Sequence, residues 1–170
     1  MQSKQADRAN QIEYRIKISR GIFRTIRTEK AGNTGFTEER EKRMGRVSEL
    51  QIREAIANFK FTGRLIERKI FGSGHINDTY LLTFEIGDMG DMKVILQRMN
   101  REIFTKPVEL MENIVGVTSY LREKIIENGG NPERETLNII PAKDGKAYFV
   151  DSKGEYWRSY KFITDATCYD

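Results

Sequence analysis

The residues best suited to chemistry lie in a glycine-rich stretch between Ile70 and Leu82. Gly72 and Gly74 allow the backbone to turn tightly and to approach a ligand, because neither carries a Cβ atom. Successive backbone N–H groups in such a turn form a concavity that suits phosphate oxygens. A Rossmann loop would instead open a helix, and a P-loop would end in Gly-Lys-Ser/Thr. A plain hairpin has the same pattern, so the neighbouring elements must decide between the two.

The elements that would position this turn are mostly strands. Ser48 and Gln51 have the spacing of a capping box and predict a helix that ends near Gly63. A longer helix is expected from Pro107 to Asn128, where glycine and proline follow. Strands are expected at Arg64–Phe71, Asp78–Ile86, Met92–Arg98, Ala147–Asp151 and Tyr156–Ile163, with a short one at Leu137–Pro141. The predicted fold is α+β, with an antiparallel five-stranded sheet and one long helix.

Charge is distributed unevenly along the 170 residues, which are enough for one domain with a core. Residues 1–43 are polar and hold 11 lysines and arginines against 6 acidic residues, whereas residues 44–170 are nearly neutral. We expect residues 1–43 to be a disordered or weakly structured basic extension and residues 44–170 to be the folded unit. The change of composition also makes Met44 a candidate translation start.

Several kinds of site and location are excluded by composition. The chain has one histidine, His75, and one cysteine, Cys168, so it lacks the ligands of a zinc site and the second thiol of an internal disulfide. No run approaches the roughly 18 apolar residues that span a bilayer. The N-terminus also lacks the apolar core of a signal peptide. The sequence therefore predicts a cytoplasmic protein that does not contact a membrane.

Four segments carry a resemblance to a known family: Gly72–Tyr80, Ile95–Asn100, Pro107–Ile114 and Trp157–Ile163. They resemble the N-terminal lobe of the aminoglycoside phosphotransferase and choline kinase superfamily, and more narrowly the N-acetylhexosamine 1-kinases. The match extends over about residues 47–170. It implies a protein-kinase-like N-terminal lobe that binds ATP. The parent reaction would transfer the γ-phosphate to the anomeric hydroxyl of an N-acetylhexosamine.

The resemblance also implies roles for individual residues. Those expected at the ATP phosphates lie in and after the turn: Gly72, Ser73, Gly74, His75, Asn77 and Thr79. Arg98 would contact phosphate, and Glu112 on the long helix would orient it, as a Lys–Glu pair does in protein kinases. Glu109, one helical turn earlier, is the alternative carboxylate. The hinge, whose backbone would pair with adenine, is Phe162, Ile163 and Thr164.

Some of these residues also have a simpler interpretation. Asn77 and Asp78 can stabilise the turn through side-chain bonds to the backbone. Arg98 can be a surface arginine of its strand, and His75 can be a polar loop residue. The ATP-binding interpretation requires all of them to lie around one site.

Phosphoryl transfer in this superfamily needs a catalytic aspartate on a His-x-Asp-type loop and ligands for magnesium. The resemblance places these groups and the sugar site in a C-terminal lobe that is absent here, so no catalytic or metal-binding residue is assigned. We expect the chain alone to bind ATP and to be inactive, with the missing lobe or a second chain as its partner. The alternative is a non-catalytic binding or regulatory module that uses the basic arm. Nucleic acid is not the expected partner, because Glu38, Glu39 and Glu41 dilute the basic charge.

Overall fold

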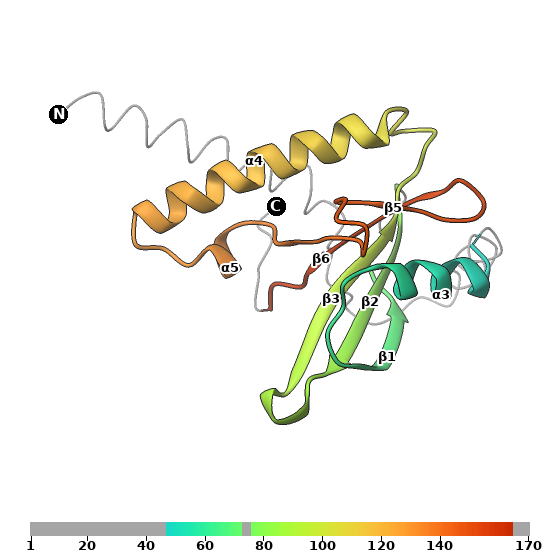
Figure 1. The fold of residues 1–170 in the computed structure, drawn as a ribbon, viewed down its shortest axis with the longest axis horizontal. Helices are drawn as coiled ribbons and strands as arrows, with labels where there is room; N and C mark the ends of the chain where they lie inside the picture. The colour runs from blue at the N-terminus through green and yellow to red at the C-terminus, as the bar shows by residue number, and fades with distance from the viewer. Residues whose placement is uncertain (1–46, 73–75, 165–170) are drawn as a thin grey trace, which may run out of the picture.

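The computed structural model describes residues 47–72 and 76–164, which form an α+β fold (Figure 1). Its helices are α3 (Glu49–Asn58), α4 (Pro107–Glu127) and α5 (Pro132–Glu135), with a 3-10 turn, η1 (Gly87–Met89). Its strands are β1 (Arg64–Ile70), β2 (Asp78–Glu85), β3 (Asp91–Arg98), β4 (Ile139–Ile140), β5 (Phe149–Val150) and β6 (Tyr156–Lys161). The predicted extension at residues 1–43 lies outside the described residues.

All strands belong to one antiparallel sheet in the order β1-β2-β3-β6-β4, with β5 also paired to β6. One side of β6 pairs with β3, so β4 and β5 share the other side. β4 lies opposite Ser159 and Tyr160, and β5 lies opposite Tyr156 and Trp157. The sheet is therefore five strands wide, as predicted, but is built from six strands. The outermost position is divided because the chain leaves the edge in a turn around Gly145.

Two hairpins account for the first three strands, as the sequence predicted. β1 and β2 pair around the glycine turn, and their register shifts at a bulge between Leu65 and Glu67. β2 and β3 pair without a shift from Asp78 opposite Arg98 to Glu85 opposite Asp91. The 3-10 turn η1 closes this second hairpin, and Ile86 N–H donates to the Gly90 carbonyl at 3.0 Å.

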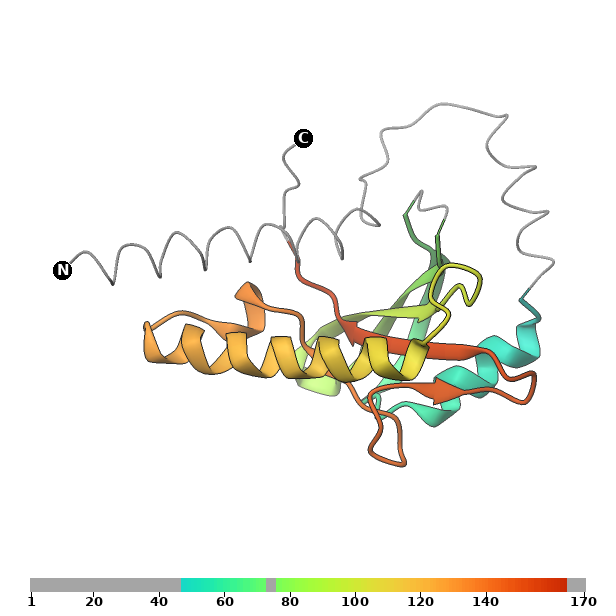
Figure 2. The same ribbon diagram turned by 90° about the horizontal axis from the view of Figure 1, so that it is seen from above.

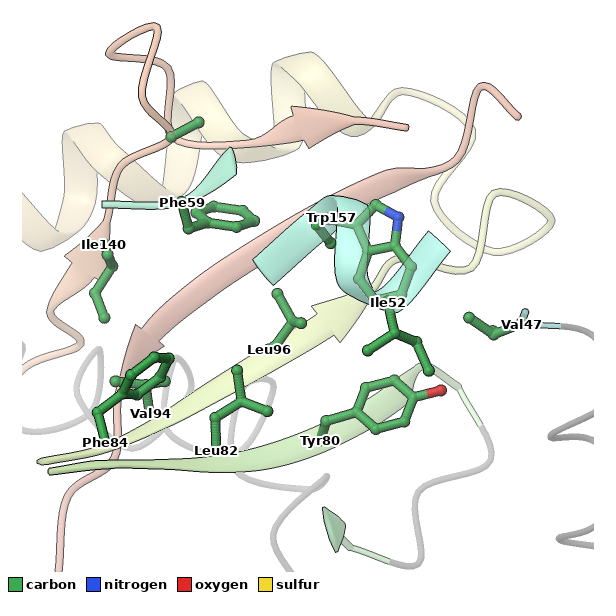
Figure 3. Packing of buried hydrophobic residues seen from close by; sticks show 12 residues of the cluster. Val47, Ile52, Phe59, Tyr80, Leu82, Phe84, Val94, Leu96, Ile140 and Trp157 are labelled. Carbon is green, nitrogen blue, oxygen red and sulfur yellow. The ribbon is translucent and has the colours of Figure 1, made fainter. Parts of the chain in front are cut away.

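The larger core lies between α3 and one face of the sheet, which we call the α3 face (Figure 3). Ser48 caps α3, and the predicted capping box with Gln51 is present. Every second residue of a strand points to the same face. Those on the α3 face are Tyr80, Leu82 and Phe84 of β2, Val94 and Leu96 of β3, and Trp157 of β6. Ile52 and Phe59 cover them from the helix side.

The opposite face, which we call the Tyr160 face, buries a smaller apolar cluster of Leu81, Ile95 and Tyr160. Phe71, Leu137, Ile139 and Phe162 pack against this cluster and are partly buried. The central strands are thus buried on both faces, which explains the unbroken apolar run of β3.

The helix α4 is a long rod beside the sheet, with α5 next to its C-terminal end (Figures 1 and 2). Pro107 occupies its first turn, as predicted. The helix ends before Gly129, whose φ of +72° is the left-handed conformation usual after a helix. Asn131 then caps α5, an element that the sequence analysis did not predict. None of the helices within the described residues is long and apolar enough to cross a membrane.

Candidate functional site

The predicted glycine turn joins β1 to β2 at one end of the sheet. Gly72 has a φ of +80°, a conformation that glycine adopts readily. Phe71 N–H donates to the Thr79 carbonyl at 2.9 Å, which closes the hairpin just outside the turn. The predicted phosphate contacts Ser73, Gly74 and His75 lie outside the described residues.

Asn77 has a structural role in this turn. Its side chain is buried, and its Oδ1 accepts a hydrogen bond from Asn100 N–H at 3.0 Å. The partner lies directly after β3, so the bond ties the turn to the end of the neighbouring hairpin. The side-chain-to-backbone bond proposed for Asn77 is thus present, although it reaches across the sheet and is not local.

Arg98 lies on the α3 face, because it is directly opposite Trp157 in the sheet. Its Nε donates to Asp78 Oδ2 at 2.8 Å, and its Nη2 contacts the same oxygen. Its Nη1 lies 3.7 Å from Glu155 Oε2. The guanidinium is therefore held between two carboxylates, and it clamps the first residue of β2 to the last residue of β3.

The predicted ion pair between Arg98 and Glu112 is not formed, because Arg98 pairs with Asp78 and Glu155. Glu112 is exposed on α4 and makes no ion pair with Arg98 in the part of the chain that the structure describes. The alternative carboxylate, Glu109, pairs instead with Lys106 at 3.0 Å. The reason is strand pairing. Asp78 lies directly opposite Arg98 on the same face of the sheet, so its carboxylate is the one that binds the guanidinium. A hairpin centred on residue 88 could have predicted that pair from the sequence.

A row of polar side chains crosses the Tyr160 face directly after the glycine turn. Gln97 Nε2 donates to Thr79 Oγ1 at 2.9 Å, and Arg158 Nε donates to Gln97 Oε1 at 3.0 Å. The three residues are register partners on β2, β3 and β6, so they lie side by side on one face. We call Thr79, Gln97 and Arg158 the polar row. Thr79 was predicted as a site residue, whereas Gln97 and Arg158 were not.

The electrostatics of the polar row are dominated by Arg158. It is 7% exposed, and burial lowers the pKa of its guanidinium, which nevertheless stays charged because an arginine titrates far above neutral pH. The neighbouring phenol of Tyr160 has its pKa raised to about 12 by burial, so it is neutral at pH 7. No carboxylate within residues 47–72 and 76–164 pairs with Arg158. The row therefore presents a positive charge without a negative partner.

The predicted hinge follows β6 and lies on the same face. Phe162 N–H donates to the Lys93 carbonyl at 3.0 Å, so it is already used within the sheet. The Phe162 ring meets the Phe71 ring edge to face, with centroids 5.4 Å apart. The Thr164 carbonyl accepts from Arg134 Nη2 at 3.2 Å. Of the three hinge residues, only Ile163 makes no hydrogen bond to another described residue, so its backbone groups can pair with a ligand.

The polar row, Phe71 just before the turn and Phe162 of the hinge thus share the Tyr160 face, while Arg98 and Glu112 lie elsewhere. This face therefore combines the buried cation of Arg158 with the aromatic rings of Phe71 and Phe162. Among the described residues, no group of three or more histidine, cysteine, aspartate or glutamate side chains is placed to hold a metal ion. No protein-family model matches the sequence.

Proposed function

We propose that this chain is the nucleotide-binding half of a kinase-like phosphotransferase. The observation that carries the proposal is the Tyr160 face, which combines the buried cation of Arg158 with Phe71, just before the glycine turn, and Phe162 of the predicted hinge. A nucleotide site uses a cation and backbone N–H groups for phosphate, and apolar surface with free backbone groups for the base. The resemblance to N-acetylhexosamine 1-kinases indicates ATP as the nucleotide and an amino sugar as the acceptor.

The order of elements supports the same proposal. In protein kinases the glycine-rich loop precedes a third strand and then a helix that contributes a glutamate. Here the glycine turn joins β1 to β2, β3 follows, and the long helix α4 comes next. The hinge residues follow β6, which is hydrogen-bonded to β3 in the centre of the sheet. The base and the phosphates would then lie under β2, β3 and β6.

Phosphoryl transfer requires further groups that this sequence does not carry. Its one histidine, His75, is followed by Ile76 and Asn77 and so does not form a His-x-Asp sequence. The catalytic base, the magnesium ligands and the sugar site would come from another segment or a second chain. We expect the 170 residues alone to bind ATP and to release no ADP when magnesium and an N-acetylhexosamine are added. ADP release by the chain alone would contradict this division.

Isothermal titration calorimetry of the 170-residue chain with ATP tests the proposal. Weaker binding of inorganic tripolyphosphate than of ATP, together with retained binding of ADP, would support a site that recognises the base. Ile163→Pro removes the free backbone N–H at the hinge, whereas Ile163→Ala keeps it. One lost hydrogen bond should weaken ATP binding by about 3- to 10-fold in the proline variant only. Absence of ATP binding at millimolar concentration would overturn the proposal.

A further inference from the structure

The buried residues that the structure describes include two charged side chains, Asp151 and Arg158. They differ in the number of hydrogen bonds that stabilise the charge. Asp151 accepts hydrogen bonds at both carboxylate oxygens, from Gln51, Trp157 and two backbone N–H groups. Arg158 has five N–H donors, and its side chain makes one hydrogen bond, from Nε to Gln97. A buried charge without a counter-charge is costly to the folded state. The fold thus retains a cation that its own residues do not neutralise.

The free end of Arg158 is in contact with solvent. Every side-chain nitrogen or oxygen that is fully sealed from solvent has a hydrogen-bond partner in the described structure. Nη1 and Nη2 of Arg158 have no such partner there, so they are not fully sealed. The edge of the guanidinium that carries these two atoms therefore keeps some contact with solvent, although the residue as a whole is buried.

The polar row fixes the direction in which this edge points. Thr79 Oγ1 accepts from the amide nitrogen of Gln97, which leaves the amide oxygen to face Arg158 Nε. Turning the Gln97 amide over would place its N–H₂ group against another N–H donor. The guanidinium is consequently held by its Nε side, and its Nη1–Nη2 edge has no partner among the described residues.

The other arginines within residues 47–72 and 76–164 do not offer such an edge. Arg53, Arg64, Arg68, Arg98 and Arg122 each pair with a carboxylate. Arg101 and Arg134 are exposed and donate to backbone carbonyls. Among the arginines that the structure describes, Arg158 is set apart because it is buried, charged and without a carboxylate.

We propose that Arg158 is the phosphate-binding residue of the Tyr160 face, and that Gln97 and Thr79 position it. The Nη1–Nη2 edge matches two oxygens of a phosphate group, which is the geometry that guanidinium recognises best. The polar row begins at Thr79 on β2, one of the two strands that the glycine turn joins. This inference rests on the proposed nucleotide-binding function. It transfers to Arg158 the role that the sequence suggested for Arg98.

Titration calorimetry of the 170-residue chain with ATP, inorganic tripolyphosphate and adenosine tests the inference. The variant is Arg158→Met, and its matched control is Arg98→Met, an equal change on the opposite face. We expect Arg158→Met to weaken ATP and tripolyphosphate binding by about 10- to 100-fold, the loss of charge-assisted hydrogen bonds. Adenosine binding should stay unchanged, and Arg98→Met should keep wild-type affinity for all three ligands.

The melting temperature of the ligand-free proteins separates a binding role from a structural one. Removal of the unneutralised buried charge should offset the loss of the hydrogen bond to Gln97 Oε1, so the melting temperature of Arg158→Met should stay close to that of wild type. A structural arginine would lower it. Arg158→Lys, which keeps a charge but not the two-pronged edge, should recover part of the tripolyphosphate affinity.

The outcomes distinguish the two proposals. Equal ATP affinity of wild type and Arg158→Met would overturn the role of Arg158 and leave nucleotide binding intact. Tripolyphosphate binding that depends on Arg158, without tighter binding of ATP, would support the anion site and overturn the nucleotide function. If Arg158→Met does not fold, wild-type NMR decides: tripolyphosphate should shift the Nε–H signal of Arg158 and not that of Arg98. Equal or absent shifts would overturn the inference.

Discussion

The carboxylate of Asp151 attaches α3 to the β5–β6 hairpin, and Asp151→Asn would test this role. Oδ2 accepts from Gln51 Nε2 at 2.9 Å and from Trp157 Nε1 at 2.8 Å. Oδ1 accepts from the backbone N–H groups of Lys153 at 2.8 Å and Glu155 at 3.0 Å. An asparagine has only one acceptor oxygen, so its N–H₂ group must face two of these four donors whichever way it turns.

We expect Asp151→Asn to lower the free energy of unfolding by about 3 kcal/mol. Each hydrogen bond to a charged group contributes about 1.5–3 kcal/mol, and two are lost. The variant no longer buries a charge, which offsets part of that loss. Urea unfolding can be followed by the fluorescence of Trp157, the single tryptophan, with circular dichroism as a second probe.

The matched control is Asp144→Asn, which changes an exposed carboxylate that pairs with Lys146 at 3.0 Å. Because the pair is fully exposed, its loss should leave the free energy of unfolding nearly unchanged. A loss below about 1 kcal/mol for Asp151→Asn would refute the anchoring role given to this carboxylate.

The pH dependence gives a second test of the same anchor. Burial raises the pKa of Asp151, but the hydrogen bonds from Trp157 and the nearby backbone outweigh it and hold the pKa below its usual value. A group with a depressed folded-state pKa stabilises above its unfolded pKa, about 3.9, and loses this effect as the pH falls through the folded value. The difference between wild type and Asp151→Asn should therefore shrink below about pH 4. A difference that stays constant from pH 7 to pH 3 would contradict a charge-based anchor.

Three further predictions concern separate parts of the chain. Arg98→Ala should lower the free energy of unfolding by about 2 kcal/mol, because its ion pair with Asp78 is partly buried. Arg64→Ala, which removes an exposed ion pair, should change it by less than about 1 kcal/mol. Equal losses of the two variants in urea unfolding would refute the stabilising role of the Arg98–Asp78 pair. Arg68→Ala should raise the pKa of Glu49 from about 2 toward its usual value, since the Arg68 hydrogen bond is the main cause of the low pKa. An NMR titration that still gives about 2 would point to another cause. Gly63→Ala should cost more than about 2 kcal/mol, because φ is +91° and the new Cβ would clash with a backbone oxygen of β2; a loss typical of a free surface site would contradict the close approach.

Local signals were sufficient to predict most of the fold. The Ser48–Gln51 capping box, Pro107 at a helix start and the glycine turns each depend on residues close in sequence, and the structure has them where they were expected. The short helix α5 was missed although Asn131 and Pro132 carry its start signal. That pair also marks the end of α4, and a four-residue helix has too few residues to show a period.

The site was harder to predict because the central strands are buried on both faces. Alternation of polar and apolar residues normally shows which way a strand residue points. In β3 the run Val94, Ile95, Leu96 has no such alternation. The sequence therefore did not show whether Arg98 or its neighbour Gln97 would lie on the Tyr160 face. That choice follows from strand register. Arg158 was hidden for the same reason, because β6 is buried on both faces from Trp157 to Tyr160.

The division of the outer sheet position between β4 and β5 has a consequence for association between molecules. Each piece is two residues long, too short to offer a continuous row of backbone groups to another chain. The other edge strand, β1, is longer, and all seven of its residues are exposed. It carries Arg64, Glu67, Arg68 and Lys69 and is twisted by the bulge after Leu65. Charge and irregular pairing at this edge oppose the addition of a further strand, so both borders of the sheet are protected against growth into fibres.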